Sequence, residues 1–470
     1  MKPNKLKRNL IIIFSIIIVL ALTILVLYMT TDIFRTKRGA FFRYAMQIPE
    51  IFDVLDTEEE YQTFQKTKQS NTYTTTGEMK ITSSENIADE SILSKLSMTV
   101  FGKTNNKTEQ SNYDVSIKSD STELFNTTIA RDKNLFGFYS SQIADGYIVF
   151  RNDNLTDFAS KINLENAENV PNQIMFFNKD KILEVSNIEK RHLEEYIKMI
   201  RNQAPDTSYS KNTGERIEIE GQKYNTTSYT LSLNSKQNSD LQISLLSEMV
   251  QDSIMMNFIT SKCVLLNLNT DFTDINTLNS KMKERIEELK SNPELAGDFS
   301  ITVYEYRQKN IQTKIQMGNK TITISQINND EDNFVVIKVE EENEPTFNIK
   351  VENNNGTHTI RIQKDDDGII NSVEVIYNMT GTVAENNVQN HMTINIVDGI
   401  KTVSFEYNDN ITFTNDIGTF KNMQDEKVAV INDYDKDFLN EFLNTLKNQI
   451  NYVYTSQGAS IGINLDPLFE

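Results

Sequence analysis

The feature that most constrains this chain is an uninterrupted apolar run close to its start. Leu10 to Met29 reads LIIIFSIIIVLALTILVLYM and holds no charged residue. With a rise of about 1.5 Å per residue, a helix of this length crosses the ~30 Å hydrocarbon core of a bilayer. A buried helix of a soluble protein is rarely apolar on every face, and a cleaved signal peptide has a shorter apolar region and a small-residue cleavage site. The sequence therefore predicts an uncleaved transmembrane helix over residues 10–29.

The orientation of this helix depends on the residues that flank it. Four Lys or Arg side chains precede the run and four more follow it before residue 44, so the positive-inside rule is almost balanced. The rest of the chain is acidic, and the whole protein has a net charge of −19. We expect a single-pass cell-membrane protein with residues 1–9 in the cytoplasm and the body outside it. The acidic balance argues against nucleic acid as a partner.

Two segments follow the membrane helix in the predicted order. Residues 30–70 place aromatic and aliphatic side chains at roughly helical spacing and contain few Gly or Ser, which predicts a juxtamembrane helical stalk or a docking helix rather than a flexible linker. Residues 71–297 are predicted to form a β-rich domain that also contains helices. These helices are expected near 187–201, 235–257 and 274–290. Ser186 and Glu189 have the spacing of a capping box at the start of the first helix.

The last predicted domain, residues 298–470, is an antiparallel β-meander that ends in a helix near 433–453. Gly318-Asn319 and Asp398-Gly399 each lie between alternating apolar and polar residues, as two-residue hairpin turns do. Only the amphipathic helices remain to cover the apolar side of the strands, and the helix near 433–453 is expected to pack on the meander before it. The predicted fold class is therefore α+β: one transmembrane helix, then a largely antiparallel sheet, a curved meander or half-barrel, covered by amphipathic helices.

One segment partly matches a calcium-binding loop. Asp365, Asp367, Gly368 and Glu374 fall on loop positions 3, 5, 6 and 12. Position 1 is Gln363 where the loop needs Asp, and the flanking residues alternate as strands where helices are needed. We therefore interpret this segment as an Asp-Gly hairpin turn and assign it no metal ligand.

The other candidate residues do not form a recognisable site. Ser208 and Lys211 fit a Ser-x-x-Lys pattern, but no Ser-Asp-Asn or Lys-Thr-Gly accompanies it. Cys263 lies in an apolar run, which favours a small buried side chain. The His residues are far apart in the sequence: His192, His358 and His391. We assign no catalytic, cofactor-binding or metal-binding residues, and expect no cofactor and no enzyme activity.

Several short segments give the chain a family resemblance. They are FFRY at 41–44, YTTTG at 73–77, DGYIVFRNDNL at 145–155 and NTTSYTL at 225–231. With the basic tail and the apolar run, this layout resembles the uncharacterised membrane-anchored proteins of clostridial, low-GC Gram-positive bacteria. These are aromatic and turn residues, so the resemblance implies structure and supplies no catalytic residue. Strands wrapped over helices are also loosely similar to the lipoprotein-carrier fold, an open half-barrel around an apolar cavity.

We expect the extracytoplasmic body to bind or position a lipid or other amphiphile, a peptide or an envelope protein without catalysis. The bilayer is a further expected partner, through residues 10–29. Two alternatives stay open, namely a purely structural or sensory ectodomain and an envelope hydrolase without a recognisable motif. An apolar cavity of ~300–1,000 Å³ under the sheet would favour binding. A cleft with perturbed titratable groups would favour the hydrolase.

Deleting residues 1–31 is expected to release a soluble, folded, monomeric body, because the remaining sequence has no other apolar run of this length. Fractionation after a salt wash checks this. A truncated protein that stays in the membrane pellet would show that a second membrane attachment exists.

Overall fold

The computed structural model describes most of the body of the protein. The described residues are 36–45, 47, 59–85, 94–120, 122–162, 164, 167, 170–175, 181–182, 184–328, 333–366, 368–415, 417–420, 423 and 428–461. The predicted transmembrane run over residues 10–29 lies outside them. Within the described ranges, no helix combines the length and the apolar character needed to cross a membrane.

The chain forms two compact units, and each is built from two separate segments. The first unit takes residues 1–52 and 174–349, and the second takes residues 53–173 and 350–470. This division differs from the expected boundary between residues 297 and 298. The reason is that β1 (Thr72–Glu85) pairs antiparallel with β17 (Lys401–Phe413), which brings an early and a late segment into one sheet. Each unit is α+β, with an open and mostly antiparallel sheet.

The first unit contains a sheet of sequential antiparallel strands. Its strands, in spatial order, are β7 (Tyr209–Ile219), β8 (Gln222–Leu233), β9 (Phe299–Tyr306), β10 (Lys309–Met317), β11 (Lys320–Asn328) and β12 (Asn333–Glu341). The predicted hairpin at Gly318-Asn319 is confirmed, since Met317 pairs with Lys320 and Gly318 has a φ of 58°. β13 (Thr346–Asn354) then carries the chain from this unit into the second.

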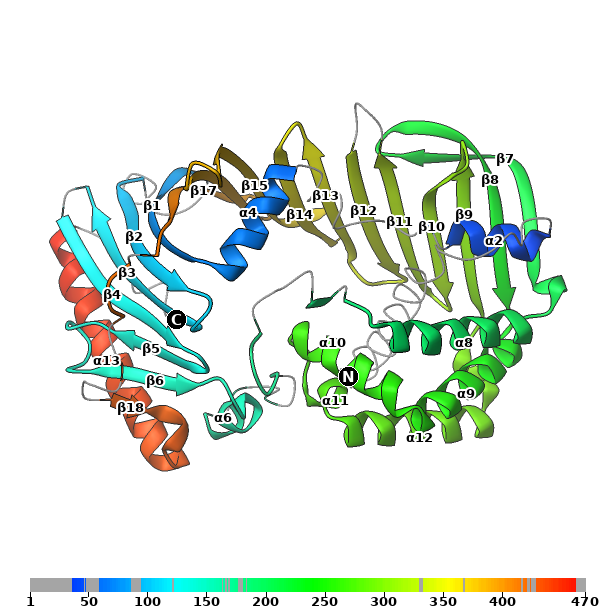
Figure 1. Ribbon diagram of the computed structural model, residues 1–470, viewed down its shortest axis with the longest axis horizontal. Coiled ribbons are helices and arrows are strands. Elements are labelled where there is room, and N and C mark those ends of the chain that lie inside the picture. The colour runs from blue at the N-terminus through cyan, green and yellow to red at the C-terminus, as the bar shows by residue number, and fades with distance from the viewer. Residues whose placement is uncertain are drawn as a thin grey trace. The chain divides into compact units, whose positions relative to one another are not determined.

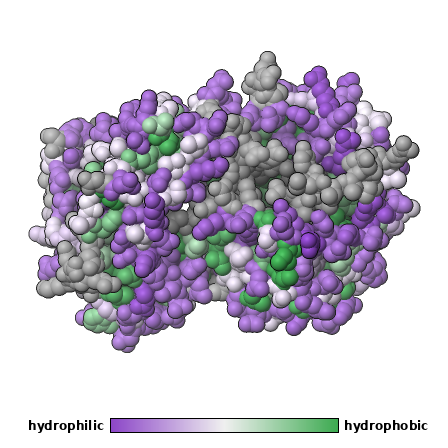
Figure 2. All heavy atoms as spheres, viewed as in Figure 1, coloured by the Kyte–Doolittle hydropathy of each residue, from purple (hydrophilic) through white to green (hydrophobic). Residues whose placement is uncertain are grey.

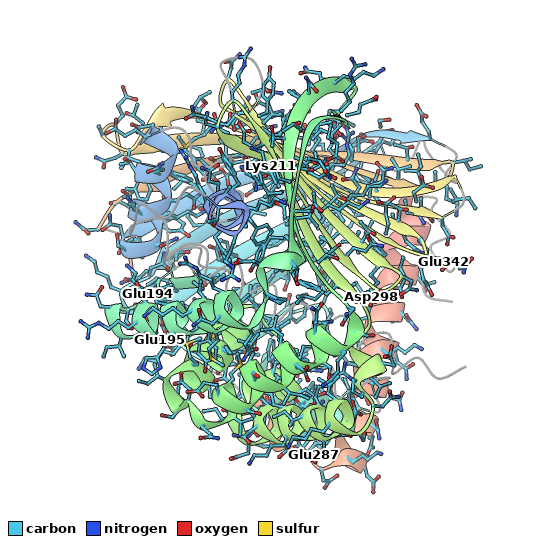
Figure 3. All side chains as sticks on the ribbon, turned by 90° about the vertical axis from the view of Figure 1, so that its right-hand side faces the viewer. Glu194, Glu195, Lys211, Glu287, Asp298 and Glu342 are labelled. Atoms are coloured by element: carbon cyan, nitrogen blue, oxygen red, sulfur yellow. The ribbon has the colours of Figure 1, made fainter. Side chains whose placement is uncertain are left out.

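The helices of the first unit pack mainly on one another (Figure 1). They are α8 (Asn187–Gln203), α9 (Ser235–Gln251), α10 (Ser253–Leu265), α11 (Thr270–Thr273) and α12 (Ile275–Ser291), with short 3-10 turns η2 (Asp206–Ser208) and η3 (Pro293–Ala296). The capping box of Ser186 and Glu189 is confirmed. Figure 3 shows Glu194 and Glu195 on α8 and Glu287 on α12, at the outer side of this layer. The charged faces of the helices are thus solvated and their apolar faces form a shared core.

The single helix predicted over residues 235–257 is wrong, because the structure divides it into α9 and α10. Asp252 lies between them in an extended conformation. Its Oδ1 accepts hydrogen bonds from the backbone N–H groups of Ile254 and Met255, at 3.1 and 3.0 Å. A carboxylate that satisfies these free N–H groups starts a new helix, which explains the break.

Of the two alternatives for residues 30–70, a helical stalk or a docking helix, the described residues bear out the docking helix. α2 (Lys37–Ala45) lies across the strands of the first unit, as Figure 1 shows, and its Phe41 and Tyr44 contact Tyr209 and Tyr229. α4 (Glu59–Ser70) belongs to the second unit and buries Phe64 there. Both helices are docked on sheets, because large aromatic side chains gain more from burial than from a solvated stalk.

The second unit holds the longer sheet. After β14 (Thr357–Asp366), β15 (Ile369–Thr382) and β16 (Asn387–Asp398), the spatial order runs through β17 and β1 to β2 (Leu96–Asn105), β3 (Gln110–Ser119), β4 (Thr122–Asp132), β5 (Leu135–Tyr139) and β6 (Tyr147–Arg151). β18 (Val428–Val430) adds to β6 in parallel. The unit also contains α6 (Leu155–Lys161) and, after the 3-10 turn η4 (Ile431–Asp433), the long α13 (Lys436–Ile461). Asp398 pairs with Lys401, which confirms the predicted Asp398-Gly399 hairpin.

The C-terminal helix is present as α13, but it shares a unit with only part of the meander that it was expected to cover. α13 belongs to the second unit, whereas β9 to β12 belong to the first. Leu439 near its start is fully buried. The later members of the same apolar stripe, among them Leu443 and Leu446, are only half-buried. The helix is therefore anchored chiefly at its first turn.

Leu439→Ala is expected to lower the free energy of unfolding by about 2–5 kcal/mol, because it leaves a cavity at a fully buried site. Leu446→Ala is the matched control and should cost under about 2 kcal/mol, since its side chain is only partly removed from water. Chemical denaturation of both variants measures the difference. Equal losses would contradict anchoring at the first turn.

Candidate functional site

The calcium-like segment forms the turn of an antiparallel hairpin. Asp365 pairs with Ile370 and Asp366 with Ile369, so β14 runs directly into β15. The backbone N–H of Gly368 donates to Asp365 Oδ1 at 2.9 Å, and Gly368 has a φ of 89°. Asp367 lies outside the described residues. The interpretation as a hairpin turn is thereby confirmed for the strands on both sides.

Glu374, the twelfth residue of that pattern, lies along β15 and is already engaged. Its Oε1 accepts from Arg361 Nε at 2.9 Å, and its Oε2 accepts from Asn395 Nδ2 at 2.9 Å. Burial alone would raise the pKa of Glu374, but the bonds from Asn395 and Arg361 hold it below its ordinary value. This carboxylate is a cross-strand partner within the sheet and does not turn toward Asp365.

The remaining candidate residues are dispersed. Ser208 is buried in η2. Lys211 lies on β7 (Figure 3). Its amine lies over the Tyr229 ring, 5.4 Å from the ring centroid. Burial raises the pKa of the Cys263 thiol to about 12, as expected for a small buried side chain. Among the described residues, no three His, Cys, Asp or Glu side chains come together as a metal-binding group.

Each histidine has a separate environment. His192 Nδ1 lies 2.7 Å from Asp252 Oδ2, which ties α8 to the cap of α10. His391 Nδ1 lies 2.6 Å from Asn408 Oδ1 on the neighbouring strand. His358 is buried, and its ring centroid lies 4.8 Å from that of Tyr61. These contacts join elements of one unit in each case.

The most unusual surface of the second unit is one face of its sheet, here called the apolar face. Cross-strand partners share a face of a sheet, so the pairings define it directly. For example, Val373 pairs with Ile396, and Ile396 with Val403. Its members on β14–β17 and β1–β3 are Ile360, Ile362, Val373, Val375, Met392, Ile394, Ile396, Val403, Phe405, Met79, Ile81, Met98, Val100, Val115 and Ile117.

No member of the apolar face is buried. Ile362, Val373 and Ile396 are 49%, 42% and 39% exposed, side by side on adjacent strands. The side of the molecule seen in Figure 2 is mostly hydrophilic, with hydrophobic residues in small groups. A contiguous apolar area of this kind on a folded protein usually marks a binding surface.

Exposure changes along the strands because α4 covers one end of this face. There Phe64 of α4 packs with Tyr73, Val388, Ile411 and Phe413, and all five are buried. Along β16 the side chains of this side change from buried at Val388 and Asn390 to exposed at Ile396. The helix thus closes the apolar face at one end only.

A row of polar side chains, here called the polar row, lies between the covered and the open parts. Tyr377 Oη donates to Asn390 Oδ1 at 2.6 Å, and Asn390 Nδ2 donates to Asp409 Oδ1 at 2.6 Å. Burial raises the pKa of Tyr407, and the neighbouring Asp409 carboxylate raises it further. On β3, the Tyr113 hydroxyl lies 2.8 Å from Thr104 Oγ1. The polar row consists of Tyr377, Asn390, Asp409, Tyr407, Tyr113 and Thr104.

Two glycines allow the tyrosines of this row to lie flat on the sheet. A Cβ on Gly77 would come within 2.6 Å of the Tyr407 hydroxyl. A Cβ on Gly102 would come within 2.4 Å of the Tyr113 ring. Both glycines face the same side of the sheet as these rings. Because glycine has no Cβ, the rings can occupy the space above its backbone.

The opposite face of the same strands carries an open groove of about 720 Å³. Many of the residues that line it are polar, among them Glu78, Asp114 and Asn126, but most of its exposed lining is apolar and includes the half-exposed ring of Phe101. Thr76 pairs with Phe101, and Phe101 with Asp114, which places these side chains away from the apolar face. The volume is in the range of a ligand site, but the groove is open and charged side chains lie along it.

Inspection of the sequence missed the polar row, although a signal for it exists. On β17, Asp409 interrupts an otherwise apolar inward series that includes Phe405 and Ile411. On β16, Asn390 interrupts the series between Val388 and Met392 in the same way. A polar residue at the same level of two neighbouring strands indicates a shared polar position, but the strand register must be known before the coincidence is visible.

A comparison with known protein families identifies the family of this chain. Residues 2–464 match a family of unknown function, DUF6583. The chain belongs to this family. The comparison with curated proteins finds no match.

Three solved structures show a distant likeness to this family member. One, described as "Asymmetric conductivity of engineered proteins", is 8% identical, with a TM-score of 0.19, and covers 73% of this chain and 98% of its own. Two variants of the vaccine antigen transferrin binding protein B from Haemophilus parasuis are 8% and 9% identical, each with a TM-score of 0.11. They cover 73% of this chain, and 77% and 76% of their own.

Calcium at millimolar concentration is expected to shift the thermal unfolding midpoint by less than about two degrees relative to a magnesium control. A site of micromolar affinity would add about 4 kcal/mol at that concentration, which would be easily detected. Differential scanning calorimetry measures the shift. A larger shift that Asp365→Ala abolishes would show that the hairpin turn binds calcium after all.

Proposed function

We propose that the second unit binds an amphiphile, with the hydrocarbon chain lying on the apolar face. The observation that carries this proposal is the row of exposed side chains Ile362, Val373 and Ile396 in register on adjacent strands. At ~25 cal/mol per Å² of apolar surface, covering such an area provides a substantial driving force for a ligand. A hydrocarbon chain supplies this cover without making hydrogen bonds.

The chemistry of the surface favours an amphiphile over a peptide. A peptide strand binds through backbone hydrogen bonds to the edge of a sheet. The apolar face instead presents side chains from the middle of the sheet, whose backbone groups are paired with neighbouring strands. The polar row at one end gives the face a polar and an apolar part, which is the pattern of an amphiphile itself.

This proposal includes the predicted anchor. Residues 10–29 would tether the protein to the cell membrane, with the body extracytoplasmic and beside the lipids that it binds. A sheet with a helix on one end of its apolar face also fits the loose likeness to lipoprotein-carrier half-barrels, which enclose an apolar cavity. The protein is then a non-catalytic, membrane-tethered binding protein, as the resemblance to clostridial membrane-anchored proteins suggests.

The test is photo-crosslinking of the full chain in the membranes of the expression host. With p-benzoylphenylalanine at position 396, mass spectrometry is expected to find adducts that carry hydrocarbon-chain lipids. The matched control places the same group at position 101, which is similarly exposed but on the opposite face. Equal lipid adducts at both positions would contradict the proposal and favour a purely structural or sensory body.

The orientation has its own test. A cysteine introduced as Asp366→Cys is expected to react with an impermeant thiol reagent on intact cells, because Asp366 is exposed at a hairpin turn. The native Cys263 is a built-in control, since it is 3% exposed and burial raises its pKa. Labelling only after cell lysis would place the body in the cytoplasm.

A further inference from the structure

We propose that the polar row and Lys68 bind the head group of this amphiphile, and that the head group is zwitterionic, with a phosphate ester and a primary ammonium group. The inference rests on the proposed function and specifies its ligand class. It follows from two opposite charges that lie at the closed end of the apolar face without forming a salt bridge with each other.

The negative charge is that of Asp409. Its place in the register is beside Gly77 on β1 and Asn390 on β16, at the centre of the polar row. One carboxylate oxygen accepts the hydrogen bond from Asn390 Nδ2. Within the described part of the chain no Lys or Arg forms a salt bridge with Asp409. A carboxylate has acceptor sites for several donors, so this group can still receive an ammonium N–H.

The positive charge is that of Lys68 on α4. Its Nζ lies 5.5 Å from the Phe64 ring centroid and 5.9 Å from that of Tyr73, so the amine is held over aromatic faces. Burial lowers the pKa of Lys68, and the attraction of Asp409 opposes this change. No carboxylate of the described residues forms a salt bridge with the amine. Its three N–H donors are suited to a phosphate, because the lysine ammonium binds phosphate as a compact positive charge.

These charges discriminate between head groups. A head group with only a negative charge would pair with Lys68 but would also meet Asp409. An uncharged diacylglycerol would leave both charges without a counter-charge and would displace their water. A zwitterion pairs its phosphate with Lys68 and its ammonium with Asp409. The position of the pair beside the apolar face keeps the acyl chains on that face.

The experiment uses the full chain in vesicles of equal parts phosphatidylethanolamine and phosphatidylglycerol with identical acyl chains. With the crosslinking residue at position 396, we expect an at least fivefold excess of phosphatidylethanolamine over phosphatidylglycerol among the adducts. At position 101 the ratio should be that of the vesicle. The ratio in the otherwise unchanged protein tests the inference by itself, whether or not further variants fold.

Two charge variants then test the named residues. Asp409→Asn keeps the shape and an acceptor for Asn390 but removes the charge, so the ratio should shift at least fivefold toward phosphatidylglycerol. Lys68→Met keeps the apolar stem and should lower the yield of both phospholipids relative to added diacylglycerol. The matched controls are Asp398→Asn and Lys66→Met, which remove the same charges at exposed positions on β16 and α4. The control ratios should equal that of the unchanged protein.

The outcomes separate the two proposals. Strong lipid adducts at position 396 with the vesicle ratio of head groups would overturn the zwitterion inference and leave the proposed function intact. The same holds if the charge variants change the ratio no more than their controls do. Adducts at position 396 that do not exceed those at position 101 would overturn the proposed function itself.

Discussion

The antiparallel pairing of β1 with β17 is the interaction on which the second unit depends. It joins Tyr73 to Phe413 at one end and Glu85 to Thr402 at the other, with an irregularity after Ile81. This long ladder places the N-terminal strands β1–β6 and the C-terminal strands β14–β17 in one sheet, and it sets which side chains share a face. A shift of one residue would turn every inward side chain outward, so the apolar face and the polar row both follow from this register.

The docking of α4 gives the apolar face its two ends. Phe64 lies in a core with Val388 and Ile411, and the backbone N–H of Val383 donates to Glu60 Oε1 at 2.9 Å. The helix is too short to extend over the rest of the face, so the strands beyond the polar row remain open. As a result, the apolar face has α4 and the polar row at one end and exposed apolar side chains at the other.

Local sequence patterns predicted the elements well, because they depend on neighbours in the chain. The capping box at Ser186, the hairpin turns at Gly318 and Gly399, and the strand flanks of the calcium-like segment are all local features. The break at Asp252 shows where this reasoning failed, since a cap inside an apolar helical pattern has little signal of its own. The C-terminal helix shares a unit with only part of the meander that it was expected to cover, because nothing in an apolar stripe specifies which strands it contacts.

The candidate site was less predictable for the same reason. Asp409, Asn390 and Lys68 come from two strands and a helix that are up to about 340 residues apart in the chain, and their proximity depends on long-range register. The two units divide the chain differently from the expected boundary at residue 297, which assumed that each domain is continuous in sequence. Only the pairing of β1 with β17 shows that it is not.

The interleaving of the two units has a consequence for biosynthesis. All strands and helices of the first unit have been synthesised once the ribosome has passed residue 349, whereas β1–β6 still lack the partners that begin at residue 357. During that interval β1 offers an unpaired edge beside half of an apolar surface, which is a setting for aggregation or mispairing. The first unit can therefore fold before the second unit has been fully synthesised. A pause or truncation near residue 349 would leave a folded first unit attached to the unpaired strands β1–β6 of the second.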